Sequence, residues 1–239
     1  MRLDEQSNLV QSNRLMKRYL AITLHRFAFW LTAEVLDELP ELRTDFINSL
    51  VPVVERVYPK DRGLRPQTIA HHLKRYWFAT RVQGSQGYAL DFACGSGYGT
   101  EILREAGYIA RGVDIDDEAV AYAKKNFPQC SFGRMPLERK YDLITFFEAI
   151  EHLDTVTGIA VINNLKRKLN PTGKLVASIP RDRNEKRNGF HKSHWNKNGL
   201  AIYLKSKFED VKVYGQDWNT GEIGNVDPDF YIYVCSLPK

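Results

Sequence analysis

The residues best suited to chemistry lie between positions 88 and 100, where the sequence reads YALDFACGSGYGT. A short apolar run leads to Asp91, and Gly95, Gly97 and Gly99 follow at every second position. Glycine lets a backbone come close to a ligand, because no Cβ stands in the way. A strand, a glycine loop and a helix in this order place a ligand against the amino end of the helix. The carboxylate beside the loop favours a cationic ligand group, such as the ammonium of an amino acid.

A second acid, Asp114, ends the next apolar run, IARGVDID. A carboxylate at the end of a second strand can accept hydrogen bonds from both hydroxyls of a ribose. One acid for an ammonium and one for a ribose fit S-adenosylmethionine better than NAD, whose loop has to hold two phosphates. Two simpler interpretations stay open. The glycines can form an ordinary tight turn, and Asp114 or Asp116 can cap the following helix.

The composition indicates a globular protein with a modest positive charge. The 239 residues are 43% hydrophobic and 26% charged, which suits one α/β domain with an appendage or two small domains. The net charge of +5 favours an anionic partner without requiring a nucleic acid. The three cysteines form no CxxC pair, so neither a zinc knuckle nor a disulfide framework is indicated. A reducing compartment, and so a cytoplasmic protein, is expected.

No membrane span or secretory signal is predicted. The amino terminus lacks the apolar segment of a signal peptide. The most apolar stretch, Tyr19 to Leu36, contains His25, Arg26 and Glu34, and is too short and too charged to span a bilayer comfortably. A packed amphipathic helix is the better interpretation of this stretch.

The hydrophobic pattern changes near residue 83. Before it, apolar residues recur at helical spacing between prolines, and a last helix is predicted at Pro66–Val82. After it, strands are predicted at Tyr88–Ala93, Ile109–Asp114, Asp142–Phe147, Lys174–Ile179, Val211–Gly215 and Phe230–Ser236, and helices at Thr100–Ala106, Asp117–Asn126, Thr155–Leu169 and Asn196–Lys207. This alternation predicts an α/β fold with a Rossmann-like, doubly wound, mostly parallel sheet in residues 83–239. Residues 1–82 are predicted to form an N-terminal α-helical cap that contributes to the substrate region and offers a surface for a homo-oligomer.

Four sequence blocks, DFACGSGYG, GVDID, YDLITFFEAIEHL and LNPTGKLVASIP, resemble those of the class I S-adenosylmethionine-dependent methyltransferases in order and spacing. The resemblance runs from about Ala70 to the end of the chain, and it implies an enzyme that binds S-adenosylmethionine. It places the cofactor against the glycine loop and the ends of the first two strands, at Asp91, Ala93, Cys94, Gly95, Gly97 and Asp114, with Ile115 against the adenine.

The resemblance implies further cofactor contacts. The segment HHLKRYWFA resembles the helix before the glycine loop, which often lends a tyrosine or an arginine to the cofactor carboxylate, here Tyr76 or Arg75. Phe147, or its neighbour Phe146, is expected near the transferred methyl group. The sequence departs from the family at Arg134 and Met135, where many members have an acid for the adenine amino group. We therefore expect backbone and apolar contacts to the adenine, with Met135 among them.

The EHL block supplies the predicted catalytic residues. Glu148 and His152 are four positions apart, so that they would share one face of a helical turn. Together with His191 from the segment FHKSHW they are predicted to be catalytic, with a histidine as the general base. The block also resembles the metal-binding residues of small-RNA 3′-terminal ribose methyltransferases and of some ubiquinone-pathway O-methyltransferases. A divalent cation, with His194 as a further ligand, is therefore an alternative, but metal-free relatives carry the block too and we do not favour it.

The segment from Arg181 to Lys197 is rich in positive charge, with six basic and two acidic residues. Because it follows the fifth predicted strand, it should border the acceptor, and it favours an anionic acceptor. The end of the chain also resembles methyltransferases of surface-glycan synthesis. The favoured acceptor is therefore an oxygen on a sugar, a glycan or another small, phosphorylated metabolite. The alternatives are an RNA or DNA methyltransferase of the ribose 2′-O type, and a non-enzymatic protein that binds the cofactor or a partner.

Overall fold

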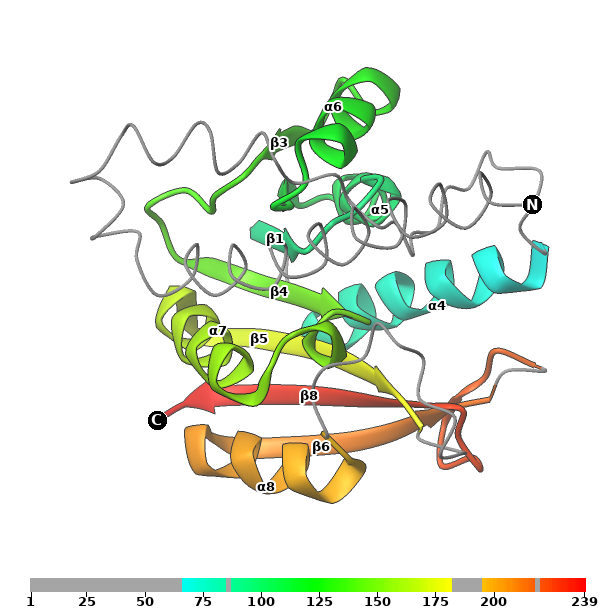
Figure 1. The fold of residues 1–239 in the computed structure, drawn as a ribbon, viewed down its shortest axis with the longest axis vertical. Coiled ribbons are helices and arrows are strands. Elements are labelled where there is room, and N and C mark those ends of the chain that lie inside the picture. Colours follow the sequence, from blue (N-terminus) through cyan, green and yellow to red (C-terminus); the bar gives the residue numbers. More distant parts are fainter. Residues whose placement is uncertain (1–65, 85–86, 182–194, 218–219) are drawn as a thin grey trace, which may run out of the picture. The chain divides into compact units, whose positions relative to one another are not determined.

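The structure, a computed structural model, describes residues 66–84, 87–181, 195–217 and 220–239 (Figure 1). The predicted helical cap therefore lies outside the described residues, except for its last helix, α4 (Pro66–Gln83). Within these residues, no helix is long and apolar enough to cross a membrane.

One eight-stranded sheet carries the fold, with the strand order β3-β2-β1-β4-β5-β8-β6-β7. Its strands are β1 (Tyr88–Phe92), β2 (Ile109–Val113), β3 (Ser131–Gly133), β4 (Tyr141–Phe147), β5 (Leu169–Pro180), β6 (Phe208–Gln216), β7 (Ile223–Gly224) and β8 (Phe230–Pro238). The first five strands are mutually parallel, and β8 is antiparallel to both β5 and β6. Consequently β6 runs in the same direction as β5, and the carboxyl ends of β1, β2, β4, β5 and β6 lie along one edge.

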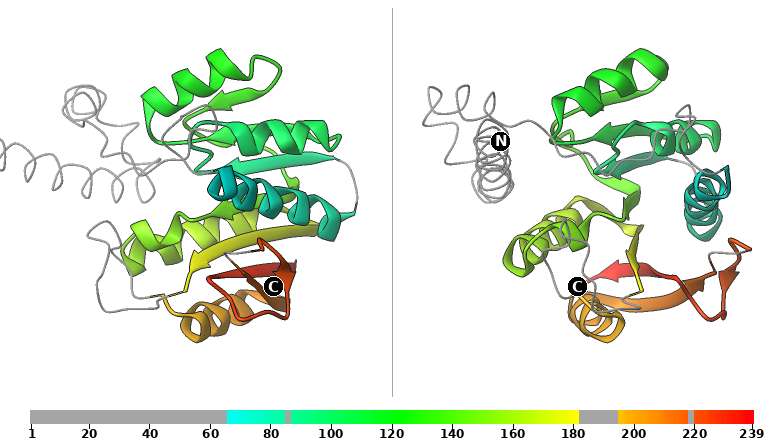
Figure 2. Two further views of the ribbon diagram at one scale, coloured as in Figure 1. Left: turned by 90° about the vertical axis from the view of Figure 1, so that its right-hand side faces the viewer. Right: turned by 45° about the vertical axis from the view of Figure 1, so that its right-hand side comes forward.

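The remaining helices are α5 (Tyr98–Glu105), α6 (Asp117–Asn126), α7 (Thr155–Lys168) and α8 (Lys197–Lys207). Helices α4 and α5 lie on one face of the sheet, and α7 and α8 lie on the other (Figure 2). Three of these helices begin at a side chain that accepts hydrogen bonds from the first turn, namely Asp116, Asp154 and Asn196. The prediction of a doubly wound, mostly parallel sheet is confirmed.

The core follows from strands that are apolar on both faces, because a parallel sheet covered by helices on both sides excludes water from both. In β4, Leu143 and Ile144 point to opposite faces of the sheet, and both are fully buried. Helix α4 packs Tyr76 and Ala79 into the same apolar cluster as Leu103 of α5. The helix that precedes the glycine loop is thus part of the sheet's own core.

Some boundaries differ from the predicted ones. Strands β3 and β7 were not predicted, because segments of three and two residues are too short to show a period. Strand β5 begins at Leu169 rather than at Lys174, and its register against β4 shifts between Tyr141 and Leu143. Helix α5 begins at Tyr98 rather than at Thr100, because Gly97 caps it in the left-handed conformation.

Gly99 allows α4 to lie close to α5. A Cβ at position 99 would lie 2.0 Å from Cζ of Tyr76 and 2.3 Å from its hydroxyl oxygen. Gly99→Ala is therefore expected to lower the free energy of unfolding by about 1–3 kcal/mol, although alanine favours a helix over glycine. Chemical denaturation measures the change. Gly224→Ala is the control, because no heavy atom lies within 4 Å of the added Cβ; a Gly99→Ala variant as stable as the wild type would contradict the contact.

Candidate functional site

The loop after β1 has a backbone that few residue types adopt. Ala93, Gly95 and Gly97 have φ angles of 61°, 52° and 87°. For Ala93 the left-handed conformation costs about 1–2 kcal/mol. A Cβ at Gly97 would lie 2.6 Å from Cβ of Ala123, because the loop approaches α6 closely. Strain of this kind persists only where the surrounding structure holds it, and it is commonly found at ligand sites.

Asp91, in β1, holds together the elements that surround the glycine loop. Its side chain is buried, and its Oδ1 accepts hydrogen bonds from the hydroxyls of Tyr76 (3.1 Å) and Thr145 (2.9 Å). Its Oδ2 accepts one from the hydroxyl of Thr100 (2.8 Å). The carboxylate therefore joins β1 to α4, α5 and β4. These hydrogen bonds show a structural role for Asp91. Its contact with the ammonium of the cofactor stays a prediction.

Burial raises the pKa of Asp91 from 3.8 to about 6, against the opposing effect of its three hydroxyl donors. The folded state therefore binds a proton here more tightly than the unfolded state. The stability that this proton contributes is present below pH 4 and is lost as the pH rises to about 6. Relative to Asp91→Asn, the wild type should lose on the order of 3 kcal/mol of unfolding free energy between pH 4 and pH 7. Urea denaturation of both proteins across this range is the measurement, and a difference that does not change with pH would contradict the prediction.

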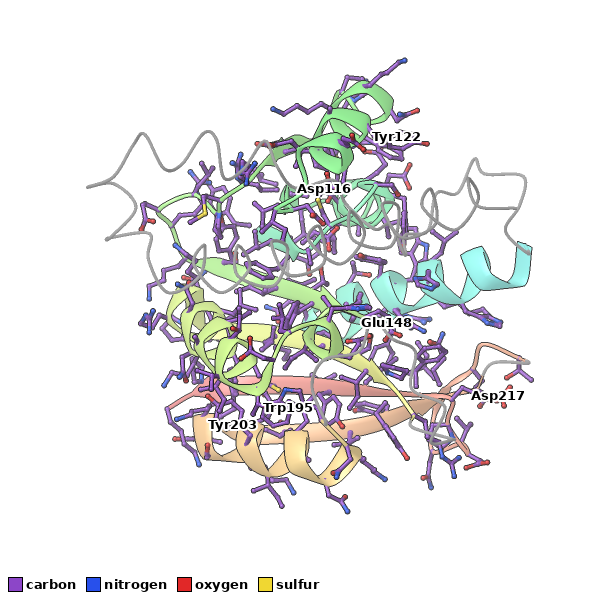
Figure 3. The ribbon with its side chains drawn as sticks, viewed as in Figure 1. Asp116, Tyr122, Glu148, Trp195, Tyr203 and Asp217 are labelled. Atoms are coloured by element: carbon purple, nitrogen blue, oxygen red, sulfur yellow. The ribbon has the colours of Figure 1, made fainter. Side chains whose placement is uncertain are left out.

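Asp114 follows β2 and contacts the glycine loop. Its Oδ2 accepts a hydrogen bond from the backbone N–H of Gly95 (2.9 Å), and its Oδ1 accepts one from that of Asp116 (3.0 Å). Asp116, which is labelled in Figure 3, is the residue that caps α6, since its side chain accepts from the N–H groups of Glu118 and Ala119. The alternative that Asp114 is only a helix cap is thus removed. A carboxylate oxygen can accept more than one hydrogen bond, so these contacts are compatible with a ribose hydroxyl, and the ribose role of Asp114 stays a prediction.

The predicted adenine region lies beyond the ends of β2 and β3. Ile115 is half-buried and Met135 is exposed. The backbone carbonyl of Met135 is fixed by the guanidinium of Arg111, with Nε at 3.1 Å and Nη2 at 2.9 Å. Arg134 forms an ion pair with Asp117 of α6. The sequence departure therefore leaves a fixed backbone and an exposed apolar side chain in this region, and their contact with an adenine stays a prediction.

An aromatic cluster of Tyr76, Tyr98 and Phe147 lies beside the glycine loop. Tyr76 packs edge to face against Phe147, with ring centroids 5.0 Å apart, and against Tyr98 at 5.7 Å. The hydroxyl of Tyr98 lies 3.1 Å from Nδ1 of His72. Burial, aided by nearby Arg75, lowers the pKa of His72 to about 3, so this imidazole is neutral at physiological pH. Cys94 packs into a separate apolar cluster with Val120, Ala123 and Phe132, and its sulfur lies 3.9 Å from the carbonyl oxygen of Gly95.

Glu148 follows β4 directly and has a φ angle of 47°. Its Oε1 accepts a hydrogen bond from the hydroxyl of Ser178 (2.6 Å) and lies 3.4 Å from Nη1 of Arg75. Its backbone N–H also donates to the Ser178 oxygen (3.2 Å). Figure 3 shows Glu148 at the end of β4 beside α4. Its side chain is 19% exposed, so it is both held and accessible.

The helical turn assumed for Glu148 and His152 is not present as predicted. The turn is a 3₁₀ helix, η1 (Ile150–His152), and Glu148 precedes it in a left-handed conformation. The shared helical face that the spacing predicted is therefore wrong. His191 and His194 lie outside the described residues, so their predicted roles stay predictions. Among the residues that are described, no three His, Cys, Asp or Glu side chains are placed to hold a metal ion.

The basic segment is described only at its two ends. Arg181 forms an ion pair with Asp227 and donates a hydrogen bond to the carbonyl of Pro228 (3.1 Å). The ammonium of Lys197 lies 5.2 Å from the centre of the Tyr231 ring. Both cations thus have partners within the chain. Its other four basic residues, Arg183, Lys186, Arg187 and Lys192, lie outside the described residues.

Sequence reasoning missed several residues of this site. Thr100 and Thr145 hold Asp91, Ser178 holds Glu148, and Gln216 contacts Arg75. The available signal was a single polar residue at the end of an otherwise apolar strand, as with Ser178 in LVASIP. The partner of such a residue lies on another strand, so its role is not visible from its own segment.

Comparisons with known proteins identify the family of the chain. A family model described as a methyltransferase domain matches residues 62–209, which is more than half of the chain. A probable S-adenosylmethionine-dependent methyltransferase of Mycobacterium tuberculosis is 26% identical over 164 residues, covering 60% of this chain and 59% of the relative. The ubiquinone biosynthesis O-methyltransferase of Haemophilus ducreyi is 27% identical over 132 residues, covering 48% and 55%. This chain thus spans less than two thirds of the length of the curated relatives it matches.

Among solved structures, the N-methyltransferase NodS of Bradyrhizobium japonicum, in complex with S-adenosyl-L-homocysteine, has the same fold with a TM-score of 0.60. The match has 18% sequence identity and covers 77% of this chain and 94% of NodS. Three features of the present structure are compatible with a nucleoside such as S-adenosyl-L-homocysteine. A carboxylate stands at the end of β2, a close-approach glycine loop follows β1, and an aromatic cluster stands beside the loop. The chain belongs to the class I S-adenosylmethionine-dependent methyltransferases.

Proposed function

We propose that this protein transfers a methyl group from S-adenosylmethionine to a hydroxyl oxygen of a sugar or another small, phosphorylated metabolite. The observation that carries the proposal is the position of Glu148. Its partly exposed carboxylate lies at the carboxyl end of β4, held by Ser178, at the edge where sheets of this type bind ligands. A hydroxyl acceptor has to lose its proton as the methyl group is transferred, and a carboxylate within reach can accept that proton. One relative named above is itself an O-methyltransferase.

The proposed cofactor site uses the predicted residues at the ends of β1, β2 and β4. Asp114 would hold the ribose, and Ile115 and Met135 would contact the adenine. The methionine end would lie along the loop, against Ala93, Cys94, Gly95 and Gly97. When bound, S-adenosylmethionine supplies an electrophilic methyl group on a sulfonium. The protein's own contribution is to align the acceptor oxygen with that group, because alignment lowers the barrier of a two-body displacement.

The proposed catalytic region combines one base with an apolar wall. Phe147 and Tyr76 are both buried and pack against each other, so that they exclude water beside Glu148. Glu148 would accept the proton of the acceptor. His152 and His191 stay candidate bases, with His191 outside the described residues. The anionic character of the acceptor rests on the chain's net charge of +5 and on the basic residues of the 181–197 segment.

A methyl-transfer screen tests the proposal. The purified protein is incubated with S-adenosylmethionine and with sugars, sugar phosphates, nucleotides, amines, RNA or DNA, and S-adenosylhomocysteine release is measured. We expect turnover with a hydroxyl-bearing, phosphorylated small molecule, and mass spectrometry should find an added methyl ether. Turnover confined to amines or to nucleic acid would contradict the acceptor class. Cofactor binding by calorimetry without turnover on any acceptor would favour a non-enzymatic role.

A further inference from the structure

A chain of buried polar contacts joins α4 to the ends of β4 and β6. The backbone carbonyl of His71 accepts a hydrogen bond from Nε2 of Gln216 (3.0 Å). Oε1 of Gln216 accepts one from Nε of Arg75 (2.6 Å), and Nη1 of Arg75 lies 3.4 Å from Oε1 of Glu148. Arg75 and Gln216 are completely buried. The contacts therefore connect the candidate base to a helix and a strand that are distant from it in the sequence.

The buried guanidinium of Arg75 has partners from several strands. A guanidinium stays charged at every physiological pH, and burying it costs free energy unless partners compensate. The ring of Phe230, the first residue of β8, lies 4.1 Å from Cζ of Arg75 in a cation–π contact. Gln216 fixes Nε, and Glu148 supplies the carboxylate. Gln216 and Phe230 belong to β6 and β8, and Glu148 follows β4, so these partners lie on the side of the sheet away from β2 and Asp114.

We propose that Arg75 is a positioning residue that fixes the carboxylate of Glu148, and that Gln216 in turn fixes Arg75. This inference rests on the proposed function, in which Glu148 accepts the proton of the acceptor. Glu148 has a φ angle of 47°, a conformation that is unfavourable for a residue with a side chain and that needs external contacts to persist. Ser178 on one side and Arg75 on the other provide these contacts.

The competing role for Arg75 is a direct contact with the cofactor carboxylate, as the family resemblance suggests. Nη1 and Nη2 have no hydrogen-bond acceptor within the described residues, so a carboxylate ligand would have a donor available. The two roles differ in the quantity that a substitution changes. Loss of a cofactor ligand raises the dissociation constant of the cofactor, whereas loss of a positioning contact lowers kcat at saturating cofactor.

Kinetics of three variants and one control separate these roles. With an acceptor from the screen, Arg75→Met should lower kcat about 100-fold while the cofactor dissociation constant changes less than about 3-fold. Arg75→Lys keeps the charge and should recover about a tenth of the wild-type rate, and Gln216→Met should lower kcat about 10-fold. Arg81→Met, at an exposed position of the same helix, should behave as the wild type. A cofactor dissociation constant raised 10-fold or more, with kcat retained, would overturn the proposal.

A second measurement needs no acceptor and therefore stands if the proposed function fails. In ¹⁵N-labelled full-length protein, the Nε–H resonance of Arg75 is assigned by its loss in Arg75→Lys. We expect Gln216→Met and Glu148→Gln each to shift this resonance, and S-adenosylhomocysteine to shift it much less. A shift on adding S-adenosylhomocysteine that exceeds the shift in Glu148→Gln would assign Arg75 to the cofactor instead. Because Glu148→Gln preserves the size of the side chain, this comparison does not require the Arg75→Met variant to fold.

Discussion

Asp114→Asn is expected to weaken S-adenosylmethionine binding about 10- to 100-fold, because hydrogen bonds to a charged acceptor contribute about 1.5–3 kcal/mol. The amide keeps the size of the side chain but replaces one accepting oxygen with a donor. In the wild type both oxygens already accept from backbone N–H groups, of Gly95 and of Asp116. The substitution therefore places the amide N–H group of the new side chain opposite a backbone N–H group, and neither can accept a hydrogen bond from the other. It also removes the negative charge that would hold the ribose hydroxyls. Isothermal titration calorimetry measures the affinity directly.

The neighbouring acid provides the control for this experiment. Asp116→Ala removes the side chain that caps α6, which should cost about 1 kcal/mol of stability. It should leave the affinity for S-adenosylmethionine unchanged within a factor of about 2, because Asp116 accepts from the first turn of its own helix and is not part of the proposed cofactor site. Equal losses of affinity in the two variants would show that the loop's stability, and not the Asp114 carboxylate, determines binding.

The helices and strands that could be predicted are those whose burial produces a regular pattern of apolar residues in the sequence. Strands β1, β2 and β4 are short and mostly apolar, and β1 and β4 are buried along most of their length because helices cover both faces of the parallel sheet. Their ends could be placed because a polar residue, Asp114, or a glycine loop follows at once. The first residues of β5, by contrast, include Pro171 and Gly173, which are typical of a turn. Only Leu169 pairs with Tyr141 of β4, and the next pair joins Lys174 to Leu143, so the turn-like residues lie within a register shift. No local pattern indicates the isolated pairing of Leu169.

The sequence indicated where the candidate site residues lie in the fold, but not which residues they contact. The pattern placed Asp91 beside the loop, yet its burial and its hydroxyl partners depend on Tyr76 and Thr145, which belong to another helix and another strand. The spacing of Glu148 and His152 indicated a shared helical face only if a regular helix connects them. The left-handed backbone at Glu148 and the 3₁₀ turn after it remove that condition. A non-glycine residue in a left-handed conformation has no reliable sequence signal, because tertiary contacts hold it there.

Glu148→Gln is expected to lower kcat about 10²- to 10⁴-fold with little change in cofactor affinity, because positioned general bases contribute factors of this size. Glutamine can still accept the hydrogen bond from Ser178 and lie near Arg75, so the geometry of the site should persist, but an amide cannot take up the acceptor's proton. Single-turnover kinetics at saturating cofactor measure the methyl-transfer step itself.

Ser178→Ala separates the base from its support. It removes one contact to Glu148 but keeps the carboxylate and the ion pair with Arg75, so the same rate should fall only about 10-fold or less. If Glu148→Gln transfers the methyl group as fast as the wild type, the carboxylate is not the base. The strained backbone at position 148 would then serve to shape the acceptor site, and His152 would become the described residue to substitute next.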